Sequence, residues 1–224
     1  GPRLDRAAAL LAARFEPHRT PASTLARLDE ISATITSPTV EGVASLFNPG
    51  GFVGNSADYY DPRNSFLPSV IERRLGIPIS LATLAIEVGR RVGVDLWGVG
   101  LPGHFLVGAP EGRFIDVFAH GVVTDIDGVE AIFRDRSGGA HRFDARYAAR
   151  TSTTAIVHRM LNNLQAIAQR RGDPVMTARA VDLRLATPGR TPLERQGLAA
   201  VLVRLGFVGR ALEVYDGLER DREQ

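Results

Sequence analysis

Three polar residues in the middle of the chain carry side chains that could act together on a carbonyl group. They occur in the order Ser80, His104 and Asp116. A serine hydroxyl that gives its proton to a histidine can attack a carbonyl carbon, and a carboxylate on the other ring nitrogen holds the imidazole in the required tautomer. The trio therefore indicates acyl transfer, with Ser80 as nucleophile, His104 as base and Asp116 as the partner that orients the base.

The chain contains no cysteine, so a thiol cannot be the nucleophile. A thiol ionises near pH 8.5 and can be lowered further, whereas a serine hydroxyl has no accessible ionised form near neutrality and depends entirely on its base. Serine in the first turn of a helix is also a common capping residue. Two interpretations stay open: a Ser-His-Asp enzyme, and a protein that has the frame of such a site without its chemistry.

The elements around these residues predict how they are positioned. A loop rich in Gly, Asn and Asp, residues 48–64, precedes a short amphipathic helix that starts with Asn64 as its cap and ends at Gly76. A second helix is predicted from Pro78 to Gly93, which places Ser80 in its first turn.

Three strand-like runs follow, residues 95–100, 104–108 and 113–118, joined by turns short enough for an antiparallel meander. A helix followed by antiparallel strands predicts an α+β core in which the helix packs on one face of the sheet. Adjacent antiparallel strands can bring His104 and Asp116 side by side.

The chain changes character after Arg150, where four helical patterns fill residues 153–221. A shift of 34 residues lays Gly172 over Gly206, and this shift is the period of the tetratricopeptide repeat. The predicted domains are a core at residues 3–150 with a helical N-terminal part, and a helical, tetratricopeptide-like region at residues 151–224.

Four segments give the chain a family resemblance: residues 61–67, 73–81, 98–107 and 114–116. In these segments it resembles the SirB family of bacterial proteins. The resemblance implies a papain- or transglutaminase-like core followed by tetratricopeptide-like helices. It also implies that His104 and Asp116 match the core histidine and carboxylate. Ser80 lies near the position that the nucleophilic cysteine has at the helix start of a transglutaminase-like core, but Pro78 fits that position as an alternative, and a proline there would leave no nucleophile.

Aromatic residues near the predicted site favour binding. The predicted substrate- or partner-binding residues are Asn64, Tyr59, Tyr60 and Trp97. With no thiol present, we rank a noncatalytic module that binds or regulates a protein or peptide slightly above a Ser-His-Asp acyl-transferring hydrolase of the peptidase or amidase kind.

Composition limits the remaining classes. The 27 basic residues are all arginine, but 25 acidic residues offset them and leave a net charge of +2, so a nucleic-acid partner is not expected. No cofactor is expected, and no metal site, because the other histidines share no spacing with carboxylates: His18, His120, His141 and His158. Asp125 is expected to cap a helix near Gly128. A cytoplasmic protein without a membrane segment is expected; the oligomeric state stays open.

Overall fold

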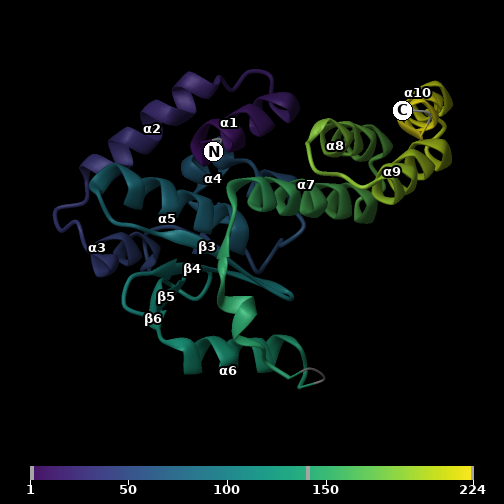
Figure 1. Ribbon diagram of the computed structural model, residues 1–224. Helices are drawn as coiled ribbons and strands as arrows, with labels where there is room; N and C mark the ends of the chain where they lie inside the picture. The colour runs from purple at the N-terminus through teal and green to yellow at the C-terminus, as the bar shows by residue number, and fades with distance from the viewer. Residues whose placement is uncertain (1–2, 140–141, 223–224) are drawn as a thin grey trace. The chain divides into compact units, whose positions relative to one another are not determined.

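The computed structural model describes residues 3–139 and 142–222 and divides the chain into two compact units, Gly1–Val157 and His158–Gln224 (Figure 1). His141, whose role was weighed above, lies outside the described residues. Because the positions of the two units relative to each other are not determined, each unit is described by itself.

The first unit combines helices with an antiparallel sheet, which confirms the α+β class. Its helices are α1 (Leu4–Phe15), α2 (Pro21–Ala33), α3 (Val40–Ala44), α4 (Leu67–Arg73), α5 (Pro78–Val92) and α6 (Ile126–Arg136), with 3-10 turns at Ser45–Phe47, Pro62–Ser65 and Ala145–Ala148. Its strands are β1 (Val53–Gly54), β2 (Leu75–Gly76), β3 (Trp97–Leu101), β4 (His104–Ala109), β5 (Arg113–Asp116), β6 (Val122–Thr124) and β7 (Arg150–Thr151).

The main sheet has the order β6-β5-β4-β3-β7, and all of its neighbouring strands are antiparallel. The predicted meander corresponds to β3, β4 and β5. The strands β6 and β7 at the two edges were not predicted. A separate short pair joins β1 to β2 in parallel.

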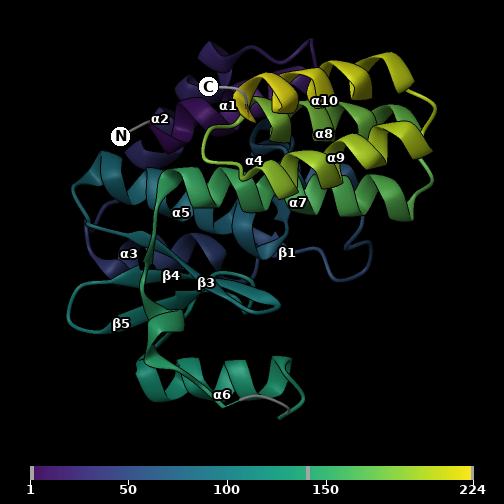
Figure 2. The same ribbon diagram turned by 45° about the vertical axis from the view of Figure 1, so that its right-hand side comes forward.

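Both faces of the sheet are covered, although only one covered face was expected. Figures 1 and 2 show α5 on one side of the sheet and α6 on the other. On the α6 side, Val129 packs with Leu101, Leu106 and Phe114 from the sheet. Every residue of β4, the central strand, is buried as a result.

The helix that carries Ser80 has the predicted bounds, because its end signals are strong. Pro78 occupies the first helical position, where a missing N–H costs nothing. Gly93 ends the helix in the left-handed region at φ 83°, which glycine adopts without strain. Twelve of its residues are buried, so α5 is the central helix of the unit.

The preceding helix differs from its prediction at both ends. α4 begins at Leu67 after Phe66, and not after Asn64, which lies in a 3-10 turn. Its last residue is Arg73, and Arg74, a non-glycine residue at φ 56°, caps it because Leu75 and Gly76 then pair with β1. A strand pairing thus ends this helix before the glycine that was expected to stop it.

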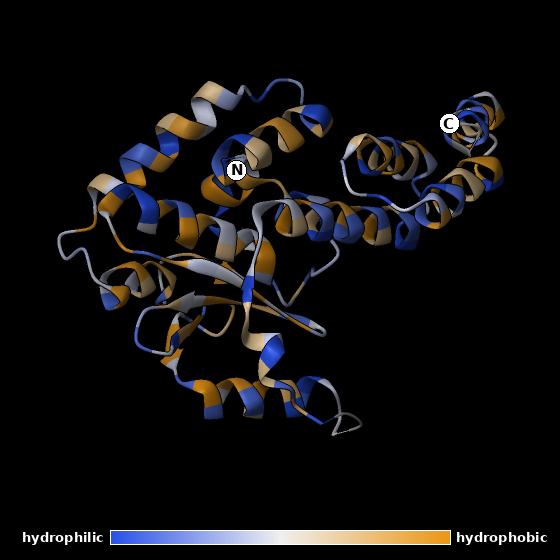
Figure 3. Ribbon diagram, viewed as in Figure 1, coloured by the Kyte–Doolittle hydropathy of each residue, from blue (hydrophilic) through white to orange (hydrophobic). Residues whose placement is uncertain are grey.

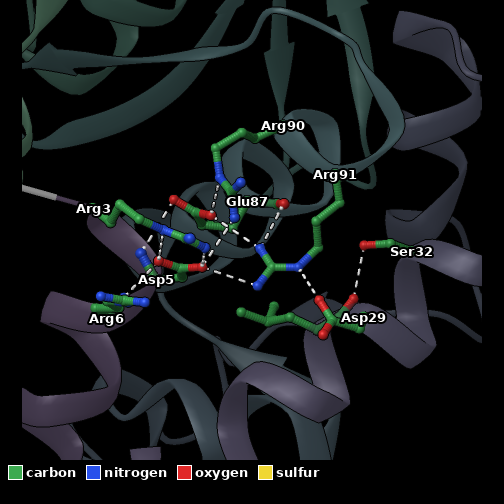
Figure 4. Close-up of polar contacts among 9 residues, drawn as sticks. Arg3, Asp5, Arg6, Asp29, Ser32, Glu87, Arg90 and Arg91 are labelled. Carbon is green, nitrogen blue, oxygen red and sulfur yellow. Dashed lines mark hydrogen bonds and ion pairs between the residues drawn. The ribbon is translucent and has the colours of Figure 1, made fainter. Parts of the chain in front are cut away.

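A buried polar cluster joins α1 to α5 and α2 (Figure 4). The Asp5 carboxylate is fully buried and accepts hydrogen bonds from Arg3 at 2.6 Å and from Arg91 at 2.9 Å. Arg91 also contacts Glu87 at 3.0 Å and Asp29 at 2.6 Å. The cluster connects residues 86 positions apart in sequence and satisfies a carboxylate that would be costly to bury alone.

The second unit is helical. It contains α7 (Thr153–Arg170) from His158 onward, α8 (Pro174–Ala186), α9 (Pro192–Arg204) and α10 (Val208–Arg222). Figure 2 shows α8, α9 and α10 side by side, and Figure 3 shows both polar and apolar residues along them. Their shared core consists of Ala178, Val181, Leu198, Ala199, Val201, Leu202 and Ala211.

Within this unit, α8 and α10 start 34 residues apart, each two residues after a glycine with positive φ. These glycines are Gly172 and Gly206. The predicted correspondence therefore aligns the starts of two helices. Whether the helices are tetratricopeptide repeats stays a prediction.

Candidate functional site

The histidine and the aspartate of the predicted trio are in direct contact. His104 opens β4, Asp116 closes β5, and His104 Nε2 lies 2.9 Å from Asp116 Oδ2. Both residues are buried, at 2% and 5% exposure. Neighbouring antiparallel strands hold the pair, as the sequence predicted.

Asp116 also organises the turn that follows it. Its Oδ1 accepts the backbone N–H groups of Phe118 at 3.0 Å and Ala119 at 3.1 Å. Burial disfavours the charged carboxylate, but His104 and these two N–H groups outweigh that cost, so the pKa of Asp116 lies below its ordinary value. Asp116 is therefore an ionised group with both oxygens committed.

Ser80 is fully buried in the first turn of α5, and its hydroxyl faces the backbone. The Oγ lies 2.6 Å from the carbonyl oxygen of Asn64 and 3.0 Å from that of Ile77, and it accepts the N–H of Ile77 at 3.1 Å. A hydroxyl can donate one hydrogen bond, and here its acceptors are backbone carbonyl oxygens. The structure thus gives Ser80 a capping and bridging role, in contrast to the hydrogen bond to an imidazole that a nucleophile needs.

Two backbone N–H groups in the first turn of α5 are not available to stabilise an oxyanion. The N–H groups of Ser80 and Leu81 both donate to the carbonyl of Ile77 at 3.1 Å. Pro78, the alternative nucleophile position, occupies the first position of the helix and has neither an N–H group nor a reactive side chain.

Asn64 is buried inside the loop. Its Nδ2 donates to the carbonyls of Asp58 at 2.8 Å and Tyr59 at 3.3 Å. Its Oδ1 accepts from Asn55 at 3.1 Å and Arg73 at 3.2 Å. With these partners the amide holds the 55–64 loop in shape, and a contact of Asn64 with substrate stays a prediction.

Tyr59 and Tyr60 do lie near the histidine, and an aromatic row connects them to it. Tyr60 packs on Tyr59 at 5.3 Å between ring centroids, Tyr59 on Phe118 at 6.2 Å, and Phe118 on His104 at 6.3 Å. Tyr60 is 39% exposed, so the row leads from the surface to the buried pair. We call these four residues the aromatic row.

Phe118 is the member that sequence reasoning missed. It lay at the end of a predicted strand, whereas the strand ends at Asp116 and Phe118 sits in the following turn. In the sequence, its position two residues after Asp116 was the only indication that Phe118 lies near the site.

Trp97 lies apart from the aromatic row. It is at the opposite end of β3 from Leu101, the residue that pairs with His104, about 13 Å away at roughly 3.3 Å per residue. Its ring lies against Gly108 and under Arg150, whose guanidinium is 4.1 Å from the ring centroid. There it lines a cavity of about 510 Å³. The structure therefore places Trp97 away from the tyrosines, and its role in binding stays a prediction.

The remaining sequence predictions concern a helix cap, metal binding and membrane-spanning helices. Asp125 caps α6 by accepting the N–H of Gly128 at 3.1 Å, as predicted. Across residues 3–139 and 142–222, His, Asp and Glu side chains form no group of three or more that could hold a metal ion. Over the same ranges, none of the helices has the length and apolar character to cross a bilayer.

This order of helix, antiparallel strands and His-Asp pair defines a transglutaminase-like core. The family model of the transglutaminase-like superfamily matches residues 3–162, and the chain belongs to that superfamily.

Several relatives can be named. A UPF0162 protein of Xylella fastidiosa is 40% identical over 175 residues, which cover 75% of this chain and 62% of that protein. A UPF0162 protein of Pseudomonas aeruginosa is 30% identical over 184 residues, or 78% and 68% of the two chains. The human F-box only protein 21 is 30% identical over 138 residues, 57% of this chain and 21% of that protein. This chain spans about three fifths of the Xylella relatives. No solved structure matches it.

Proposed function

We propose that the chain is a noncatalytic module that binds a protein or peptide segment at the aromatic row of a transglutaminase-like core. The observation that carries this proposal is the bonding of the Ser80 hydroxyl to the carbonyls of Asn64 and Ile77 in a chain without cysteine. Without an activated nucleophile, the core still offers a preformed surface, the aromatic row, beside the His104–Asp116 pair.

The aromatic row suits a peptide. Tyr60 and Tyr59 offer apolar area with few rotatable bonds, and such side chains are common anchors at interfaces. Asn64 fixes the backbone of Tyr59, so the row is preorganised and binding needs little further ordering. The finer assignment, to the SirB family with tetratricopeptide-like helices, belongs to the same proposal.

A Ser-His-Asp acyl-transferring hydrolase is the second candidate. It is favoured by the contact of 2.9 Å between His104 and Asp116, which is the base and orienting pair that such an enzyme needs. For this candidate, Ser80 would have to turn away from its carbonyl partners toward the ring.

Single introduced cysteines distinguish the two candidates, because the natural chain has no cysteine and each variant then contains one thiol at a known position. Ser80→Cys and Pro78→Cys are each alkylated with iodoacetamide between pH 5 and 9, with and without His104→Ala. We expect Cys at position 80 to react slowly at pH 6, at a rate that His104→Ala leaves unchanged. Ser56→Cys, at an exposed loop position, gives the rate of an ordinary thiol.

The proposal fails if the thiol at position 80 reacts fast at pH 6 and loses that rate with His104→Ala, because Ser80 then occupies the nucleophile position. Fast, His104-dependent reaction at position 78 supports the proposal, since the natural chain has proline there.

Binding is tested with a displayed library of random peptides. Selected peptides should bind Ser80→Ala as tightly as the unmodified protein and should lose affinity for Tyr60→Ala. Enrichment that is equal with Tyr60→Ala would place binding elsewhere.

A further inference from the structure

Three polar atoms of the helical unit are buried without a hydrogen-bond partner among the described residues. They are Nε2 of His158 on α7, Nε of Arg184 on α8 and one terminal nitrogen, Nη2, of Arg190 in the turn before α9. Buried polar atoms are nearly always paired, so an unpaired group in a folded chain requires an explanation. Here three come from consecutive elements of one unit.

The two arginine side chains are held in place by other bonds. Arg190 Nε donates to the carbonyl of Arg184 at 3.3 Å, and Arg184 Nη1 donates to Gln165 on α7. The side chain of Arg190 is only 6% exposed. Because neighbouring contacts fix both guanidinium groups, their unpaired N–H groups have a set orientation and are not free to turn toward water.

The charges of the cluster are incompletely balanced. Burial and the charge of Arg190 lower the pKa of the Arg184 guanidinium and also that of the His158 ring. Glu194 provides some compensation, since its Oε1 lies 3.5 Å from Arg190. Its other oxygen, Oε2, accepts the N–H of Thr191 at 2.8 Å and thereby caps α9. The cluster therefore holds two cations and a titratable ring against one partly committed carboxylate.

We propose that His158, Arg184 and Arg190 form a binding site for a divalent oxyanion of the phosphate and sulfate class. Such an anion has acceptor oxygens in several directions, so it can take the N–H groups of two guanidiniums at once. It would also balance the repulsion between the two arginines. We call this group the anion cluster.

The histidine makes the site sensitive to pH. The ring hydrogen-bonds the backbone of Pro188, and the charged groups that act on it are Arg190, Arg184 and Glu194. A bound dianion favours the protonated ring, whose Nε2 then becomes a donor. Affinity for sulfate, whose own charge is constant above pH 4, should fall as the pH rises through the titration of His158.

Sulfate binding to the full chain tests the proposal, with thermal unfolding and calorimetry at constant ionic strength set by sodium chloride. We expect stabilisation by sulfate beyond chloride, and about tenfold or greater loss of affinity in Arg190→Gln, because a hydrogen bond to a charged group is removed. Phosphate at pH 8 should behave as sulfate does, and acetate should bind much more weakly.

A second variant has the opposite expected effect. Glu194→Gln keeps the capping-box acceptor and removes the competing charge, so it should bind sulfate several-fold more tightly. Arg204→Gln removes the same charge as Arg190→Gln at an exposed position near the far end of α9 and should leave affinity unchanged.

The proposal is overturned if sulfate stabilises no more than chloride at equal ionic strength, or if Arg204→Gln weakens binding as much as Arg190→Gln. Equal binding of acetate would overturn the assignment to divalent anions. The NMR titration of His158 gives an independent readout: its pKa should rise when sulfate is added and should not respond in Arg190→Gln. If Arg190→Gln does not fold, the gain in Glu194→Gln still decides the outcome.

Discussion

Replacing Asp5 by asparagine keeps the size of a fully buried side chain and removes the charge that Arg3, Arg90 and Arg91 contact. The pKa of the Asp5 carboxyl is lowered from its ordinary 3.8 to about 2: burial would raise it, but hydrogen bonds from Arg3, Arg91 and the N–H of Arg6 outweigh burial. At about 1.4 kcal/mol per pH unit, this lowering corresponds to roughly 2 kcal/mol of unfolding free energy near neutral pH.

The sign follows from the direction of the shift. A carboxyl whose pKa is lower in the folded state stabilises the fold above its unfolded pKa near 4, and this contribution is lost as the pH falls toward 2. About half of it, roughly 1 kcal/mol, should be gone by pH 3. At pH 7 we expect Asp5→Asn to cost about 3 kcal/mol, the low end for breaking a buried ion pair, because Arg3 and Arg90 are nearly half exposed and can regain water.

Urea unfolding of both proteins at pH 7, 5, 4 and 3 measures the difference in stability. The difference should shrink by roughly 1 kcal/mol between pH 7 and 3. Asp144→Asn is the matched control: Arg146 contacts this carboxylate as well, but the pair is exposed and screened by water, so no comparable pH-dependent difference is expected. A difference that stays constant with pH, or an equal effect of Asp144→Asn, would refute the reasoning.

Two further substitutions test the candidate site. Ser80→Ala should destabilise the protein by about 1–3 kcal/mol, because it leaves buried backbone groups without their partner. The control Ser23→Ala removes an exposed hydroxyl and should change the stability by less than about 0.5 kcal/mol. Urea unfolding measures both, and an unchanged stability in Ser80→Ala would contradict the bridging role. Gly54→Ala puts a Cβ 2.5 Å from the Phe118 ring and should cost about 1–3 kcal/mol and weaken peptide binding, while Gly209→Ala, on a helix position with open space, should stabilise by up to about 1 kcal/mol. Equal unfolding free energies for the two glycine variants would show that the ring can move aside freely.

The sequence was most informative where a local signal determines the structure. Pro78 and Gly93 bound α5 because one fixes φ and the other adopts positive φ, and both effects act within a few residues. The contact of His104 with Asp116 followed from short turns between adjacent strands. These features need no knowledge of distant parts of the chain.

Features that depend on distant residues were not predictable in the same way. β7 has two residues and exists because it pairs with β3, about fifty positions earlier. Arg74 ends α4 because the next two residues pair with β1. The hydroxyl of Ser80 bonds to the carbonyl of Asn64, sixteen residues away, and no local sequence signal predicted this contact.

Under the proposed noncatalytic function, the His-Asp pair has a structural role in the turn after β5. Asp116 uses one oxygen for His104 and the other for the N–H groups of Phe118 and Ala119, so it fixes the turn that carries Phe118 into the aromatic row. If the aromatic row binds peptide as proposed, the carboxylate supports that surface by holding Phe118 in place.

This explanation separates two substitutions that a catalytic role would not separate. Asp116→Asn retains an acceptor for the turn, so it should keep most of the peptide affinity and cost about 1 kcal/mol of stability. Asp116→Ala leaves the N–H groups of Phe118 and Ala119 unpaired, so it should cost about 2–3 kcal/mol and lose peptide binding together with the position of Phe118. In a Ser-His-Asp enzyme the asparagine variant would be nearly as inactive as the alanine variant, because both lose the carboxylate that holds the imidazole tautomer. Urea unfolding and peptide titration of the two variants therefore decide whether Asp116 acts through the turn or through the ring of His104.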